Sequence, residues 1–159
     1  VGGFDDEFQG DMVPRVTYMG NPYSCAFSGK ALTFFSSRNL ASPELVEQRS
    51  IEERIDSVFY SDEYAAAIVR NTNGSRLEVY KKDGTHVLSK EFNFEYTHAD
   101  FDGDLIILYN EDSCRIYNMS GTEKFDATFD FPVSKIRKGR FPGTLVVTGP
   151  QQMQELKLR

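Results

Sequence analysis

The chain has 159 residues, which is enough for one domain with its own hydrophobic core. Hydrophobic residues make up 40% and charged residues 26% of the chain, a balance that excludes general disorder. The longest apolar run, residues 64–69, is too short to span a membrane. The net charge of −6 argues against binding to duplex nucleic acid, so we expect no nucleic-acid partner.

Short apolar runs recur along the chain and predict buried strands. They are Leu32–Phe35, Ala65–Val69, Leu105–Leu108 and Thr144–Thr148. Each follows a tight turn, at 28–30, 61–63, 102–104 and 141–143, and each turn follows a further strand, at 23–27, 55–60, 98–101 and 135–140. We expect near-complete burial of Ile68, Val69, Ile106, Ile107, Val146 and Val147.

An internal repeat supports this order of strands. Residues 76–85 match residues 113–122 at an offset of 37. The same offset aligns Tyr80 with Tyr117, Gly84 with Gly121, Thr85 with Thr122, Phe92 with Phe129 and Phe94 with Phe131. The pattern predicts an alternating strand, a turn that needs a positive φ at its glycine, and an outer strand.

Four short strands in about 40 residues is the size of a β-propeller blade. We therefore predict an all-β, propeller-like fold of about four antiparallel four-stranded blades, with repeats near 16–54, 55–93, 94–132 and 133–159. Residues 1–15 are expected to be an N-terminal tail or edge strand. The segment Ser42–Arg54 could begin a helix, but the repeat pattern favours strands.

The last repeat ends after its third strand, so the ring is either closed by another segment or open. Phe4–Met12 could donate the missing strand, but this segment is acidic and alternates poorly. We therefore expect a segment of a larger propeller. Its open ends would expose apolar surface, and the isolated chain would associate with itself.

Five stretches of the chain resemble an uncharacterised bacterial family of membrane-anchored proteins. These stretches are Gly3–Phe8, Asp11–Val16, Ile55–Ser61, Cys114–Tyr117 and Glu155–Arg159. The family's outer part is a propeller of the WD40 or pyrroloquinoline-quinone-like type, and the resemblance covers its C-terminal portion. It implies an anchor and earlier blades upstream and an extracytoplasmic location, and it implies no catalytic residues.

Asp100, Asp102 and Asp104 form the one candidate metal site, because calcium prefers closely spaced carboxylate oxygens. However, Leu105 stands where a calcium loop needs glycine, and Leu108 offers no acidic ligand. We therefore expect a plain Asp-Gly hairpin turn without a metal.

The other candidate residues do not form a catalytic set. Lys135, Arg137, Lys138 and Arg140 could bind phosphate or acidic lipid, or could be solvated charges on a strand edge. His86 and His98 have no zinc-ligand spacing and no nucleophile in a recognisable motif. The sequence therefore predicts no catalytic residue and no cofactor.

Two cysteines, Cys25 and Cys114, are too few for a disulfide framework. We place Cys25 in a first strand and Cys114 in a third strand of different blades. Both are therefore expected to be free thiols. Asn73 and Asn118 begin glycosylation sequons, but both are predicted turn positions where asparagine is common.

These observations favour a non-enzymatic propeller scaffold that contacts an unidentified protein partner, on the outer side of a bacterial membrane by resemblance. The alternative is a ligand-binding sensor or enzyme, with a site in a central funnel that further blades complete. Convergent carboxylates and histidines in the four turns would favour the alternative. Only Asp62, Glu63, Asp102 and Asp104 occur there.

Overall fold

The computed structural model describes residues 15–18, 23–27, 31–36, 44–51 and 53–158. All regular elements in this part of the chain are β-strands, and it holds no helix long and apolar enough to cross a membrane. The chain divides into two compact units, residues 1–92 and 93–159, and each is considered by itself.

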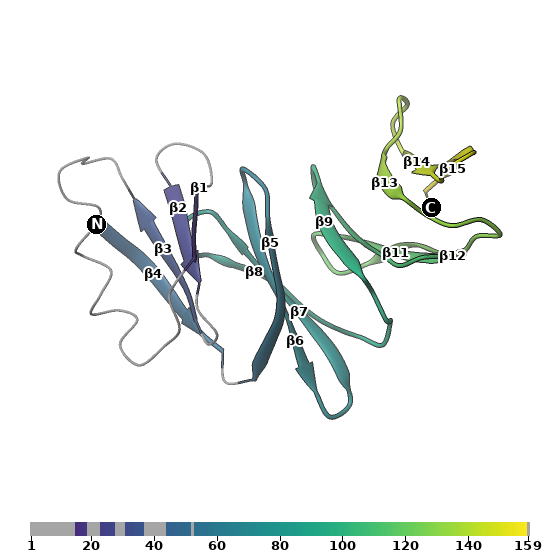
Figure 1. The fold of residues 1–159 in the computed structure, drawn as a ribbon. Helices are drawn as coiled ribbons and strands as arrows, with labels where there is room; N and C mark the ends of the chain where they lie inside the picture. Colours follow the sequence, from purple (N-terminus) through teal and green to yellow (C-terminus); the bar gives the residue numbers. More distant parts are fainter. Residues whose placement is uncertain (1–14, 19–22, 28–30, 37–43, 52, 159) are drawn as a thin grey trace. The chain divides into compact units, whose positions relative to one another are not determined.

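The first unit holds two antiparallel sheets of four strands (Figure 1). The first sheet is formed by β1 (Arg15–Tyr18), β2 (Tyr23–Phe27), β3 (Ala31–Ser36) and β4 (Glu44–Ser50). The second is formed by β5 (Arg54–Tyr60), β6 (Tyr64–Asn71), β7 (Gly74–Lys81) and β8 (His86–Phe92). Strands that are consecutive in the chain are neighbours in the sheet, as in a propeller blade.

The second unit holds one sheet of four strands and one of three. The four-stranded sheet is formed by β9 (His98–Asp102), β10 (Leu105–Tyr109), β11 (Ser113–Asn118) and β12 (Glu123–Thr128). The three-stranded sheet is formed by β13 (Lys135–Lys138), β14 (Thr144–Thr148) and β15 (Met153–Lys157). The predicted all-β class with antiparallel blades is thus confirmed.

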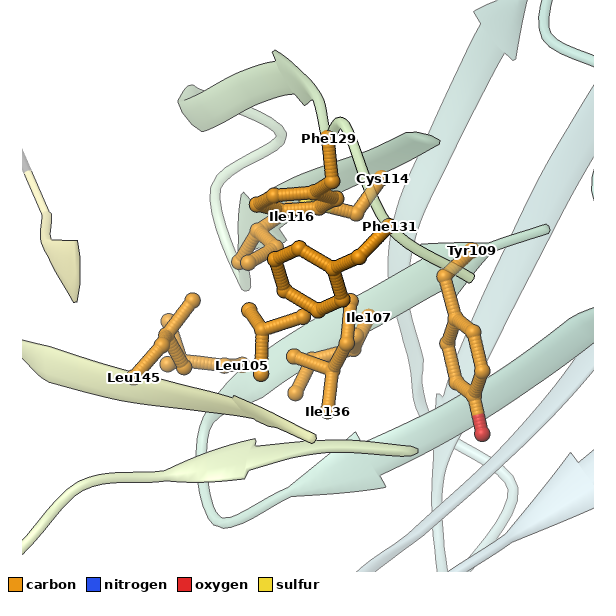
Figure 2. Close-up of a cluster of buried hydrophobic side chains, with 10 residues drawn as sticks. Leu105, Ile107, Tyr109, Cys114, Ile116, Phe129, Phe131, Ile136 and Leu145 are labelled. Atoms are coloured by element: carbon orange, nitrogen blue, oxygen red, sulfur yellow. The ribbon is translucent and has the colours of Figure 1, made fainter. Parts of the chain in front are cut away.

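Each unit has an apolar core between its two sheets. In the first unit the core joins Leu32 and Phe34 of β3 to Ala65, Ala67 and Val69 of β6. In the second unit it joins the β9–β12 sheet to the β13–β15 sheet, as Figure 2 shows. Its buried members are Leu105, Ile107, Tyr109, Cys114, Ile116, Phe129, Phe131, Ile136, Leu145 and Val147.

The predicted core residues are buried with one exception. Ile68, Val69, Ile106, Ile107 and Val147 are at most 1% exposed. The expectation for Val146 is wrong, because this side chain is only half-buried. The residues beside Val146 on β14 point into the core of the unit, so strand alternation turns Val146 to the opposite face of the sheet.

The two repeated hairpins have the predicted turns. Gly84 has a φ of 87° and Gly121 a φ of 83°, the left-handed region that glycine adopts without strain. The backbone N–H of each glycine donates to the carbonyl three residues earlier, at 2.9 Å and 3.1 Å respectively. The offset of 37 therefore aligns two equivalent turns.

The first sheet departs from the predicted strand order. Residues 44–50 form the strand β4 and not a helix, in agreement with the preferred interpretation. However, only one strand forms there, and the sheet takes its first strand from upstream, at β1. Cys25 therefore lies in a second strand rather than a first, and Leu32–Phe35 lies in a third strand rather than a second. The turn at 28–30 and the segment Phe4–Met12 lie outside the described residues.

Both cysteines are free and buried, as expected. Cys25 is on β2 and Cys114 is on β11, its predicted third strand. Loss of solvation on burial raises the pKa of each thiol to about 12. The thiolate is the reactive form, so both cysteines are packing residues here.

Candidate functional site

A buried carboxylate on β7 is the centre of the most extensive polar cluster among the described residues. Glu78 is 9% exposed. Its Oε1 accepts hydrogen bonds from Arg76 Nε at 2.7 Å and from Ser89 Oγ at 2.6 Å. Its Oε2 lies 2.9 Å from His86 Nε2. A buried carboxylate requires such partners, and here all of them come from β7 itself and its neighbour β8.

Arg76 connects this cluster to the segment between the two sheets of the first unit. Its two terminal nitrogens donate to both carboxylate oxygens of Glu53, at 2.6 Å and 3.0 Å. These hydrogen bonds lower the pKa of Glu53 to about 2. They also raise the pKa of Arg76, so both groups stay charged at any ordinary pH.

The aromatic ring of Tyr80 lies beside the cluster. The His86 ring lies edge-on to it at 5.3 Å, and the Arg49 guanidinium lies over its face at 5.8 Å. Arg49 Nε also donates to the carbonyl of Gly84, at 3.1 Å, and so ties β4 to the glycine turn of the next sheet. Burial is the main reason that the pKa of Tyr80 is raised.

A shallow pocket of about 340 Å³ opens over these side chains. It is lined by Ser50, Ile51, Glu53, Arg76, Glu78 and Tyr80. The charged groups at its base are already bonded to one another. The arrangement can therefore fix the geometry of two sheets and present a polar surface, but its donors and acceptors are engaged in the protein itself.

The second unit carries the same arrangement with the charges inverted. On β7 and β8, Glu78 is paired with Ser89, whereas on β11 and β12 Arg115 is paired with Asp126. Arg115 Nε lies 3.9 Å from a carboxylate oxygen of Asp126 and 3.9 Å from one of Glu123. A basic centre with two acidic neighbours thus replaces an acidic centre with basic and hydroxyl neighbours.

The first sheet carries a neutral version at the same place. Thr33 of β3 is fully buried and is paired with Gln48 of β4. Gln48 Nε2 donates to Thr33 Oγ1 at 3.3 Å. We call this set of equivalent residues, Thr33, Glu78 and Arg115 with their partners on the outer strand, the polar position of the blades.

A β-bulge accompanies the polar position in all three sheets. The register shifts between Phe34 and Phe35, between Val79 and Tyr80, and between Ile116 and Tyr117. Residues three apart on a regular strand point to opposite faces. The extra residue of the bulge allows His86 and Ser89, which are three apart, to reach the same carboxylate.

The three aspartates of the candidate calcium loop bond to protein N–H groups. Asp100 Oδ1 accepts from the Phe101 backbone N–H at 2.8 Å, and Asp102 accepts from the backbone N–H of Lys138. Asp104 Oδ1 lies 3.3 Å from Lys138 Nζ. Gly103 has a φ of 60°, which fits the first central position of a type II′ hairpin turn. The residues thus form the expected hairpin turn between β9 and β10.

The basic residues divide between two environments. Lys138 is held by the two aspartates of the β9–β10 turn. Lys135 and Arg137 are exposed on β13. Arg140 lines a pocket of about 280 Å³ with Phe141 and neighbouring residues of the β13–β14 turn. His98, the second histidine, stacks on Tyr109 at 4.9 Å.

Sequence reasoning singled out His86 but missed the carboxylate and the arginine that accompany it. The signal was present in the repeat. The offset of 37 aligns Glu78 with Arg115, His86 with Glu123 and Ser89 with Asp126. These pairs look unrelated as residue types, so a search for identical residues passes over them.

The chain matches DUF5711, a family of unknown function, over residues 1–158, and it belongs to that family. No curated protein matches its sequence.

Solved structures with a similar fold are WD40-type β-propellers. A fragment of HIRA is 10% identical with a TM-score of 0.61, and the match covers 86% of this chain and 49% of that one. The Neurospora crassa Pan2 WD40 domain is 10% identical with a TM-score of 0.59 and coverage of 89% and 48%. Saccharomyces cerevisiae Sqt1 is 12% identical with a TM-score of 0.56 and coverage of 91% and 44%.

The chain therefore spans about half the length of the structures that it matches. Identities this low show the fold alone. The similar structures confirm the expected WD40-like fold.

Proposed function

We propose that this chain is a non-enzymatic interaction module that binds another protein through the surfaces of its blades. The observation that carries the proposal is the repeated blade, whose fold is similar to that of WD40-type propellers. Its backbone register recurs in three sheets, while the polar side chains packed within it differ from one sheet to the next. A constant framework with variable polar groups is typical of binding scaffolds.

The bonding within the cluster supports a structural rather than a catalytic role. Glu78 uses both oxygens on neighbouring side chains, and Arg76 is shared between two carboxylates. A catalytic group needs a reactive atom available to substrate, whereas these atoms are engaged in ion pairs and hydrogen bonds of the protein.

We further propose that the protein acts on the outer side of a bacterial membrane, held by an anchor outside this chain. This part of the proposal rests on the resemblance of Gly3–Phe8 and the other matching stretches. Fractionation of cells that express the full-length protein tests it, with recovery in the membrane fraction and digestion by external protease as the expected results. Recovery with the cytosolic proteins would contradict it.

A cross-linking experiment tests the proposed interaction. The tagged chain is cross-linked in its own cells, and captured proteins are then reconstituted with the purified chain. We expect one partner that forms a saturable complex of fixed stoichiometry and is displaced by untagged chain. A chain that binds no protein, but is stabilised against heat by a small molecule, would instead support the alternative of a ligand-binding sensor.

A further inference from the structure

Charge is distributed very unevenly along the chain. Residues 133–159 contain six cationic residues and one anionic residue, so their net charge is +5. Since the whole chain carries −6, the remaining residues together carry −11. The cationic excess is thus confined to the segment that forms the three-stranded sheet β13–β15.

One face of this sheet is directed away from the core of its unit. Leu145 and Val147 of β14 and Ile136 of β13 belong to the core. Strand alternation and the register of the sheet place the intervening side chains together on the opposite face. We call this the outer face of β13–β15, and it comprises Lys135, Arg137, Thr144, Val146, Thr148, Met153, Glu155 and Lys157.

The register arranges these side chains in rows across the three strands. One row is Arg137, Val146 and Glu155, and a second is Lys135, Thr148 and Met153. The centre of the face is therefore made of small, half-buried Thr and Val side chains, with charged groups on its two outer strands.

The outer face is accessible in the structure. Lys135, Arg137, Glu155 and Lys157 are exposed, and Met153 is 68% exposed. In the part of the chain that the structure describes, no ion pair is formed by the three cations of this face, Lys135, Arg137 and Lys157. Lys138, by contrast, is neutralised by the β9–β10 turn.

We propose that the outer face of β13–β15 is a docking surface for an acidic segment of a partner protein. The inference rests on the proposed function and assigns that function to one surface. Unpaired cations around a partly apolar centre fit a segment that brings carboxylates to the edges and short apolar side chains to the middle. Carboxylates from such a segment would pair with Lys135, Arg137 and Lys157.

The composition of the face favours a protein over an anionic membrane or a free phosphate. Surfaces that bind anionic lipid concentrate several cations in one patch. Here three cations are separated by threonine and valine, and Glu155 lies among them. A carboxylate in the row repels a phosphate, whereas a protein partner can meet it with a cation of its own.

The test uses the full chain and a defined probe. The probe is a fluorescein-labelled peptide in which glutamate alternates with threonine, and its control is the same peptide with glutamine in place of glutamate. Binding is measured by fluorescence anisotropy for the wild type and for the double variant Lys135→Glu with Arg137→Glu. A matched variant, Lys81→Glu with Lys124→Glu, makes the same change of charge elsewhere, and circular dichroism checks that both are folded.

We expect saturable binding of the glutamate peptide that weakens at least about tenfold in the Lys135→Glu, Arg137→Glu variant and in high salt. The matched variant should bind as the wild type does, and the glutamine peptide should not bind. Absence of peptide binding, or equal binding by the two variants, would overturn the inference. Co-sedimentation with phosphatidylserine vesicles that is lost in the same variant would overturn it in favour of lipid.

The partner captured by cross-linking separates this inference from the proposed function. If the Lys135→Glu, Arg137→Glu variant captures the partner as well as the wild type does, the interaction module stands and the assignment to this face is wrong. If neither protein captures a partner, the proposed function itself fails.

Discussion

Replacing Glu78 with alanine should destabilise the protein, because the change removes the acceptor at the centre of the polar cluster. Arg76, His86 and Ser89 each lose a charge-assisted hydrogen bond. Breaking a fully buried ion pair costs about 3–5 kcal/mol. Here Arg76 keeps Glu53, and His86 and Ser89 are exposed enough to bond to water. We therefore expect a loss of about 2–3 kcal/mol in the free energy of unfolding.

Urea unfolding followed by far-ultraviolet circular dichroism measures this loss. Glu91→Ala is the matched control, since Glu91 is an exposed carboxylate on the same strand as His86 and Ser89. It should change the free energy of unfolding by less than about 0.5 kcal/mol. If Glu78→Ala behaved like Glu91→Ala, the cluster would be an incidental surface feature, and the argument for a structural role of the polar position would be refuted.

Three further predictions follow from burial and ionisation. Val147→Ala should cost about 1–3 kcal/mol in urea unfolding and Val146→Ala clearly less, since only Val147 is fully buried, and equal losses would contradict the assigned faces of β14. The pKa of Glu53 is about 2, below its unfolded value, so its contribution to stability is present above about pH 4.5 and is lost as the pH falls toward 2. The difference in melting temperature between the wild type and Glu53→Gln should therefore shrink over that range, and a constant difference would show that the ion pair is absent. Thiol titration without reductant should find Cys25 and Cys114 unreactive in the native protein and both reactive in denaturant, whereas failure to react in denaturant would indicate a disulfide.

The hairpins and the buried strands could be predicted because local chemistry decides them. Gly84 and Gly121 occupy turn positions that favour glycine, and the runs of apolar residues need burial on both faces. The error at Val146 arose because an apolar run does not reveal whether one or both of its faces meet another sheet. That depends on packing between sheets, which the local sequence does not record.

The order of strands in the first sheet was harder to predict because its repeat is the least regular. The segment 42–54 is long enough for two strands, but its described residues form β4 and only the first residue of β5. The earlier strands of this sheet therefore each lie one place further along the blade than predicted. The placement of Cys25 changed with it. The ion pair between Glu53 and Arg76 also depends on how the two sheets of the first unit pack, and no sequence motif predicts it.

The bulge in the outer strands constrains the length of those strands more than their composition. The residues that it leaves without a direct partner are Val46 of β4, Val87 of β8 and Lys124 of β12. An aliphatic or a charged side chain is accepted at this point. Deleting one of these residues, however, would restore the regular ladder and move one outer-strand residue of the polar position to the other face. Homologous blades should therefore vary freely in residue type here while conserving the three-residue spacing, and gaps in this spacing would mark blades that have lost the polar position.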